Sequence, residues 1–116
     1  MDARIAGFKA RLHNGTVLFA ETLALIGELY RYVPTAFKNG LGDDALHSPA
    51  GTNEGSCKVF AFARLNGLSP DETLACFGEH YQAVLADPVG TGHPNIRLFM
   101  RDGFAGIRFE GAPLVS

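Results

Sequence analysis

The centre of the chain reads NEGSCKVFAFA over residues 53–63, a polar turn that passes directly into an almost wholly apolar segment. Ser56 is a residue type that caps helix N-termini, and Gly67 stands just after the expected end of the segment. A buried β-strand over residues 59–63 would also fit, but the two caps favour a helix over residues 57–66. Because apolar residues occupy nearly all of its faces, we predict that this helix lies at the centre of the core.

Two helices are predicted on the N-terminal side of this segment. Apolar residues recur at helical spacing over residues 5–12, and Gly15 ends that helix. The next helix is expected over residues 16–32, where apolar side chains again form one stripe and Pro34 stops the helix. Residues 17–19 would also fit an extended start. Both helices carry an apolar face with which to pack on the centre.

Two further helices and a strand are predicted on the C-terminal side. The sequence SPDE at residues 69–72 is a strong helix-start signal, and the helix is expected to run to about Leu85. Asn95 is a capping residue type, so a last short helix is predicted after it. Residues 106–110 alternate as a strand does. Because a lone strand cannot satisfy its backbone groups, we pair it with residues 36–38.

Length and composition indicate one domain over residues 1–116. The apolar fraction is 47% and the charged fraction 19%, which is typical of a globular chain that can bury one modest core. The predicted fold is therefore α+β and mainly α. It has about five helices around the central helix 57–66 and a minimal two-stranded sheet formed near residues 36–38 and 106–110.

Charge and hydropathy narrow the classes of partner. The formal net charge is −2 and no basic block is present, so we expect no nucleic-acid partner. No stretch approaches the ~20 apolar residues of a membrane helix, so we expect a soluble chain made in the cytosol. The two cysteines, Cys57 and Cys76, lie in apolar surroundings and are expected to be free thiols.

Four ordered blocks resemble one known family. They read PTAFKNG at residues 34–40, NEGSCKVFAFA at 53–63, ACFGEHY at 75–81 and GHPNIR at 92–97. With the residues between them, the resemblance covers about residues 19–109 and is to the HopJ family of bacterial type III effector proteins. It implies a small protein made in the bacterial cytoplasm that a type III system can secrete into a host cell. It carries over no activity, cofactor or catalytic residue.

The start of the central helix is the first candidate binding site. Gly55, Ser56 and Lys58 would place free backbone amides, a hydroxyl and an ammonium at one point, with Asn53 in the turn before them. Helix N-termini bind phosphate or carboxylate in this way. The run lacks the spacing of a phosphate-binding P-loop. The alternative interpretation is an ordinary serine cap beside a solvated lysine.

The start of the last helix is a second candidate site. His93, Asn95 and Arg97 stand there, and they would extend an anion pocket if the two loops lie side by side. The sequence thus predicts a protein that binds a small anionic ligand through both loops. A protein partner is the other possibility, and an exposed apolar patch away from the polar loops would indicate it.

A cysteine enzyme is the competing hypothesis. Cys57 at a helix start beside Lys58 would have a stabilised thiolate, with His93 as its base and Asn95 to orient that base. No local signature of a known cysteine enzyme surrounds Cys57, so the favoured interpretation is a small buried hydrophobe.

A metal site has little support in the sequence. Cys76 and His80 share a helix face, but two ligands do not make a site, even with His93 and Cys57 nearby in three dimensions. We therefore predict no metal and no cofactor.

Overall fold

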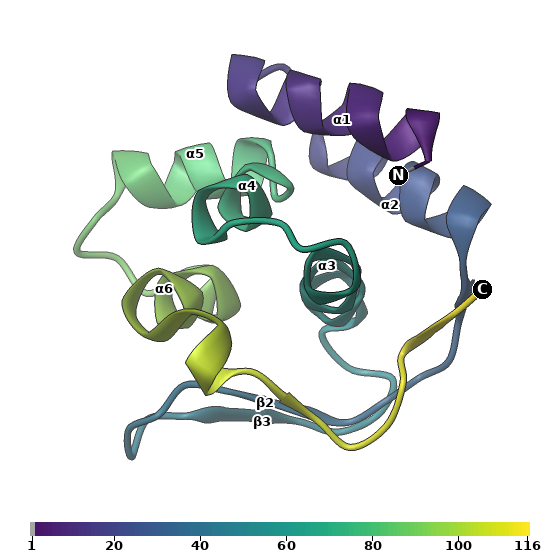
Figure 1. Cartoon of the computed structure of the whole chain (residues 1–116). Coiled ribbons are helices and arrows are strands. Elements are labelled where there is room, and N and C mark those ends of the chain that lie inside the picture. The colour runs from purple at the N-terminus through teal and green to yellow at the C-terminus, as the bar shows by residue number, and fades with distance from the viewer. Residues whose placement is uncertain (1) are drawn as a thin grey trace.

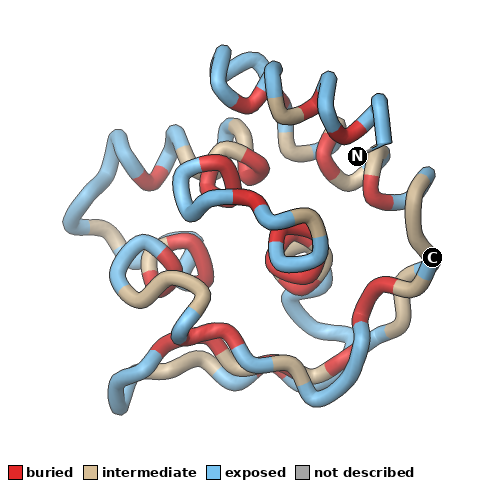
Figure 2. Tube along the Cα trace, in the orientation of Figure 1, coloured by how far each residue is buried: buried red, intermediate tan, exposed pale blue. Residues whose placement is uncertain are grey.

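Helix α3 (Glu54–Leu65) runs through the middle of the molecule, and the other elements surround it (Figure 1). The computed structural model describes residues 2–116. Val59, Phe60 and Phe62 have no exposed surface at all, and the middle of the helix is buried while its two ends reach the surface (Figure 2). The prediction of a central helix with apolar residues on nearly all of its faces is confirmed for residues 57–63.

The start of α3 differs from the prediction. The helix begins at Glu54, three residues earlier than expected, and Ser56 is not its cap. Asn53 occupies the N-cap position in a left-handed backbone conformation, with φ 49° and ψ 41°. Its side-chain Nδ2 donates to Ser48 Oγ at 2.8 Å and does not cap the helix. Asn tolerates the left-handed region better than most residues do. The chain can therefore reverse direction at Asn53, and the helix begins at the next residue, Glu54.

Helices α1 (Ala3–Asn14) and α2 (Phe19–Leu29) cover one side of α3. The first is as predicted, with Gly15 as a left-handed C-cap at φ 67°. The second begins later than the main prediction, because the Leu18 N–H donates to the Glu21 carboxylate at 3.0 Å from an extended backbone. It also ends early, since Arg31–Tyr32 forms strand β1.

The helix predicted from Pro70 to Leu85 is two helices, α4 (Pro70–Ala75) and α5 (Glu79–Ala86). The break lies at Gly78, which has φ 55° and ψ −124°. A Cβ at Gly78 would lie 2.7 Å from the backbone nitrogen of Phe19, so no larger residue fits there. The helical spacing of apolar residues continues from α4 into α5, so the sequence pattern gave no sign of the break.

The start of the last helix also differs from the prediction. Helix α6 (Pro94–Asp102) has His93 at its N-cap, not Asn95, and a 3₁₀ turn (Gly103–Gly106) follows it. Residues 2–116 contain six α-helices, that is five around α3, so the predicted α+β, mainly α fold is confirmed. In that part of the chain no helix combines the length and the apolar character needed to cross a membrane.

Two small antiparallel sheets complete the fold. The predicted pairing is confirmed: β2 (Phe37–Asn39) pairs with β4 (Arg108–Phe109), with Phe37 opposite Phe109. A third strand, β3 (Leu46–Ser48), lies on the other side of β2, so this sheet has three strands and not two. The second sheet pairs β1 with β5 (Leu114–Val115), next to the C-terminus. Strands this short carry too little alternation to be recognised in sequence.

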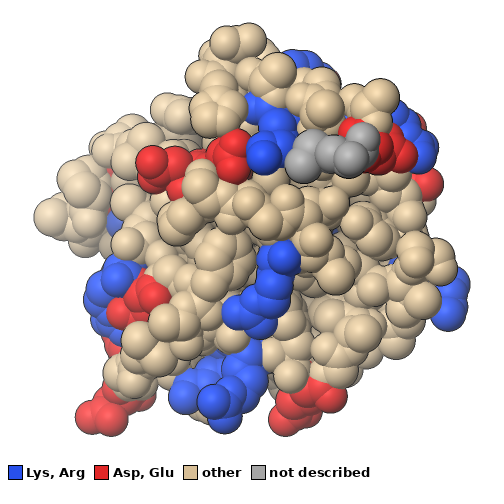
Figure 3. All heavy atoms as spheres, in the orientation of Figure 1, with Lys and Arg blue, Asp and Glu red and all other residues tan. Residues whose placement is uncertain are grey.

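The surface carries charges of both signs. On the face shown in Figure 3, Lys and Arg side chains are interspersed with Asp and Glu side chains. This distribution agrees with the small net charge of −2.

The central position of α3 leads to a stability prediction. Phe60→Ala should lower the free energy of unfolding by about 3–5 kcal/mol, because it leaves a cavity in a site with no exposed surface. Leu65→Ala on the same helix, where the side chain is 59% exposed, should change it by at most about 0.5 kcal/mol. Urea unfolding measures both, and equal costs would contradict the central role of α3.

Candidate functional site

A cavity of about 350 Å³ opens where the N-termini of α3 and α6 meet. Its walls also include the start of α2 and the segment that joins α4 to α5. The lining residues are Phe19, Asn53, Gly55, Ser56, Phe77, His80, His93, Pro94, Asn95 and Ile96. The structure therefore brings together five of the residues singled out in the sequence: Asn53, Gly55, Ser56, His93 and Asn95.

Backbone amides at both helix N-termini are free of acceptors. Among residues 2–116, nothing accepts from the N–H groups of Glu54, Gly55 and Ser56, and the first bond of α3 runs from Cys57 N to Asn53 O at 3.0 Å. At the N-terminus of α6, the backbone N–H of Asn95 likewise has no acceptor among residues 2–116. Each helix dipole also places partial positive charge at its N-terminus. The cavity thus collects hydrogen-bond donors from two elements.

The backbone is strained on both sides of the cavity. Asn53 at φ 49° and His93 at φ 54° are the only non-glycine residues of the described chain, 2–116, with positive φ. Each is the N-cap residue of a helix that faces the cavity, and neither side chain caps its own helix. Strained conformations of this kind concentrate at functional sites.

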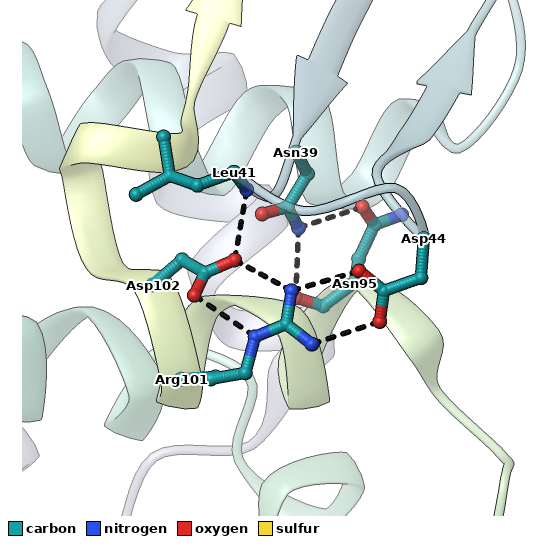
Figure 4. Close-up of polar contacts among 6 residues, drawn as sticks. All are labelled: Asn39, Leu41, Asp44, Asn95, Arg101 and Asp102. Carbon is teal, nitrogen blue, oxygen red and sulfur yellow. Dashed lines mark hydrogen bonds and ion pairs between the residues drawn. The ribbon is translucent and has the colours of Figure 1, made fainter.

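Asn95 presents a fixed, unpartnered amide at this site. The residue is 5% exposed, and its backbone oxygen and Oδ1 each accept from Asn39 Nδ2 at 2.9 Å. Because Oδ1 is held by Asn39, the Nδ2 of Asn95 turns away from that partner (Figure 4), and none of the described residues accepts from it. Asn39 itself has no exposed surface. Sequence reasoning missed Asn39, which reads as part of an Asn-Gly turn.

Aromatic rings form the rest of the wall, and the sequence did not predict this. Phe19 lies parallel to Phe77, with ring centroids 5.9 Å apart and an interplanar angle of 7°. The ring of His80 meets Phe19 edge-on at 4.9 Å, and His93 lies 4.9 Å from His80. The sequence analysis considered His80 only as a metal ligand. Nothing in the spacing of these rings along the chain marks them as neighbours.

The Phe19 ring packs so closely against Gly55 that a larger residue at position 55 would collide with it. A Cβ on Gly55 would lie 2.8 Å from Cζ of Phe19, so the ring rests directly against the first turn of α3. A glycine in the first turn of a helix therefore has a packing reason here.

Lys58 and Arg97 lie outside the cavity, contrary to the expected convergence. Lys58 Nζ lies 4.6 Å from the centroid of the Tyr32 ring. Arg97 donates to the backbone oxygens of Gly92 and Asp87 at 2.6 and 2.9 Å. Each residue follows a lining residue by two positions, which rotates its side chain by about 200° around the helix.

Cys57 does not have the properties of a nucleophile. The residue has no exposed surface, and its Sγ lies 3.7 Å from the backbone oxygen of Thr35. Burial, with a smaller contribution from Glu54, raises the pKa of the Cys57 thiol to about 11. The expected stabilisation of the thiolate is therefore wrong, because desolvation outweighs the helix terminus and Lys58. His93 lines the cavity and Cys57 does not, so the proposed catalytic pair is not assembled there.

The other sulfur is equally inaccessible. Cys76 has no exposed surface, and burial raises the pKa of its thiol to about 12. Over residues 2–116, no three His, Cys, Asp or Glu side chains are grouped so that they could hold a metal ion.

Ionic contacts fix α6 against the β2–β3 hairpin (Figure 4). Arg101 makes two hydrogen bonds to Asp44, at 2.8 and 2.9 Å, and two to Asp102 at the same distances. Asp102 Oδ2 also accepts from the Leu41 N–H at 2.9 Å. The hydrogen bonds from Arg101, and then that from Leu41, lower the pKa of Asp102 to about 2. This network holds Asn95 and Asn39 in register.

Acid should weaken that network. A carboxyl whose pKa is lowered on folding stabilises the fold above its unfolded pKa of about 4, and the stabilisation is lost as the pH falls towards 2. The thermal midpoint of Asp102→Asn should therefore fall less than that of wild type between pH 4 and pH 2. Asp43→Asn, on a carboxylate outside the network, should behave like wild type. Parallel pH curves for wild type and Asp102→Asn would contradict the assignment.

Thiol reagents should distinguish a structural from a reactive cysteine. With a pKa near 11 and no exposure, Cys57 carries about 100-fold less thiolate at neutral pH than an ordinary thiol, and the native protein should not react with iodoacetamide. Ser56→Cys places a thiol on the cavity wall in the same turn and should react readily. Mass spectrometry locates the modification. Alkylation of Cys57 in the native wild type at the rate of a free thiol would contradict this prediction.

Comparison with known proteins gives a family and a close structural relative. The model of the HopJ type III effector protein family matches residues 5–114. A crystal structure titled "unknown function protein VPA0580" superposes with a TM-score of 0.87 at 40% sequence identity, over 99% of this chain and 93% of that one. A search of curated proteins gave no match. Because the family model spans nearly the whole chain, this protein belongs to the HopJ type III effector protein family.

Proposed function

We propose that this protein binds a small oxyanion, a phosphate or carboxylate group, in the cavity between the N-termini of α3 and α6. The observation that carries the proposal is the convergence of two uncapped helix N-termini on one cavity of about 350 Å³. Such a cavity is within the size range of small-molecule sites.

The chemistry of the lining supports an anion over a cation. Among the residues that line the cavity there is no Asp or Glu. Donors come from the free amides of Gly55 and Ser56, from the Ser56 hydroxyl and from the Nδ2 of Asn95. None of these donors has an acceptor among residues 2–116, so each is free to bind a ligand. An oxyanion would satisfy several of these donors at once and would lie at the positive ends of two helix dipoles.

The position of the protein in its family suggests where it acts. Members carry the description of a type III effector, so we propose delivery into a host cell as the route by which the protein meets its ligand. The chemistry of the cavity would be the same for a protein that stays in the bacterial cytoplasm. In either compartment the proposed activity is binding.

A protein partner is the second candidate function. A groove of about 360 Å³ between α5 and α6 is lined partly by Leu85 and Met100, which are 47% and 44% exposed. Catalysis by Cys57 has no comparable support, because the thiol is buried and its pKa is raised.

Thermal-shift assays test the oxyanion site. Inorganic phosphate or a small carboxylate, at about 100 times its dissociation constant, should stabilise the wild type by about 2.7 kcal/mol and raise the midpoint by several degrees. Ser56→Asp should lose this shift, because its carboxylate faces the same amides. That variant should still fold, since acids are favourable in the first turn of a helix.

Two variants serve as controls for this experiment. Ala3→Asp adds the same charge to the first turn of α1, and Lys58→Ala removes a cation that points at Tyr32. Both should keep the full ligand shift. The proposal fails if no phosphate or carboxylate shifts the wild type, or if Ser56→Asp responds as the wild type does. The absence of any shift would instead favour the protein-partner function.

A further inference from the structure

We infer that the cavity takes an aromatic oxyanion, a compound in which a phosphate or carboxylate group is joined to a planar unsaturated ring. The inference rests on the proposed oxyanion site and specifies the rest of the ligand. It follows from the composition of the lining, in which hydrogen-bond donors from α3 and α6 are combined with the rings of Phe19, Phe77, His80 and His93.

The donor side includes a side-chain amide without a partner, on a residue that is mostly buried. Asn95 is 5% exposed, its Oδ1 is taken by Asn39, and its Nδ2 has no acceptor among residues 2–116. The orientation of the amide is fixed, because Asn39 Nδ2 holds both oxygens of Asn95 at 2.9 Å. Asn95 therefore offers a donor to a ligand oxygen, beside the free amides of α3.

The ring side is held in place before any ligand binds. Phe77 is 2% exposed and supports Phe19 in a parallel arrangement. Phe19 in turn meets His80 edge-on, and His93 lies against His80. Gly55 lets the Phe19 ring lie against α3, next to the free amides. A wall that is already ordered costs a ligand little entropy on binding.

The volume requires more than an inorganic ion. A cavity of about 350 Å³ corresponds to about a dozen water-sized groups, whereas a phosphate or carboxylate group fills fewer than half of these. The remaining space borders the rings. Aromatic pairs in offset or edge-to-face contact gain affinity beyond the area that they bury. A planar ring fits this space better than a saturated ring of the same size.

Matched pairs of ligands test the inference. Phenyl phosphate and cyclohexyl phosphate carry the same phosphate group and differ only in the ring. Benzoate and cyclohexanecarboxylate are matched in the same way, with a carboxylate. In NMR titrations of the wild type, each aromatic compound should bind about fivefold more tightly than its saturated partner. Phe19→Leu should reduce this ratio towards one, because it removes one of the rings that line the cavity. Phe104→Leu removes a half-buried ring that does not line the cavity and should keep the wild-type ratio.

A second pair of variants guards against misfolding of Phe19→Leu. His80→Leu should lower the ratio, whereas His80→Phe retains a ring and should preserve it. Equal binding of the aromatic and saturated compounds by the wild type would overturn the inference, as would an unchanged ratio in both Phe19→Leu and His80→Leu. In those cases inorganic phosphate would still bind, which separates this failure from failure of the oxyanion site itself.

Discussion

The burial of the middle of α3, residues 57–63, is the constraint on which the rest of the structure depends. Phe60 and Phe62 have no exposed surface, and rings from α1, β2 and α6, among others, pack against them. A helix enclosed in this way cannot be displaced without opening the core. Its N-terminus is therefore fixed in space, and with it the row of free amides at Glu54, Gly55 and Ser56. The cavity is a consequence of where that buried helix begins.

Two glycines, Gly55 and Gly78, leave the room that lets aromatic residues pack beside the N-terminus of α3. Gly78 lets the backbone before α2 pass within contact distance, and the Phe19 N–H can then donate to the Glu79 carboxylate at 2.8 Å. Gly55 leaves room for the Phe19 ring against α3. A side chain at either glycine would collide with residues 17–19. The break between α4 and α5 thus has a structural cause, and it also brings His80 to the site.

The polar side of the cavity depends on contacts between distant parts of the chain. Asn39 comes from β2 and Asn95 from α6, and their amide contact is buried beneath the surface. Arg101 and Asp102 join α6 to the same hairpin from outside, in contact with Asp44 and the Leu41 backbone. The buried contact orients a donor, and the exposed network keeps the two elements in register. The Asn39–Asn95 contact and the Arg101 network thus have different roles in placing the donor.

The sequence by itself determined the central helix, the α1 helix with its Gly15 cap, the pairing of β2 with β4, and the two loops that meet at the cavity. These features follow from local rules: the spacing of apolar residues, the special backbone of glycine, and the need of a lone strand for a partner. Only the tertiary structure decided the break at Gly78, the ring wall, the role of Asn39 and the exclusion of Lys58 and Arg97. These depend on distances between residues far apart in the chain and on where the first turn of α3 lies, which is at Glu54 and not at Cys57.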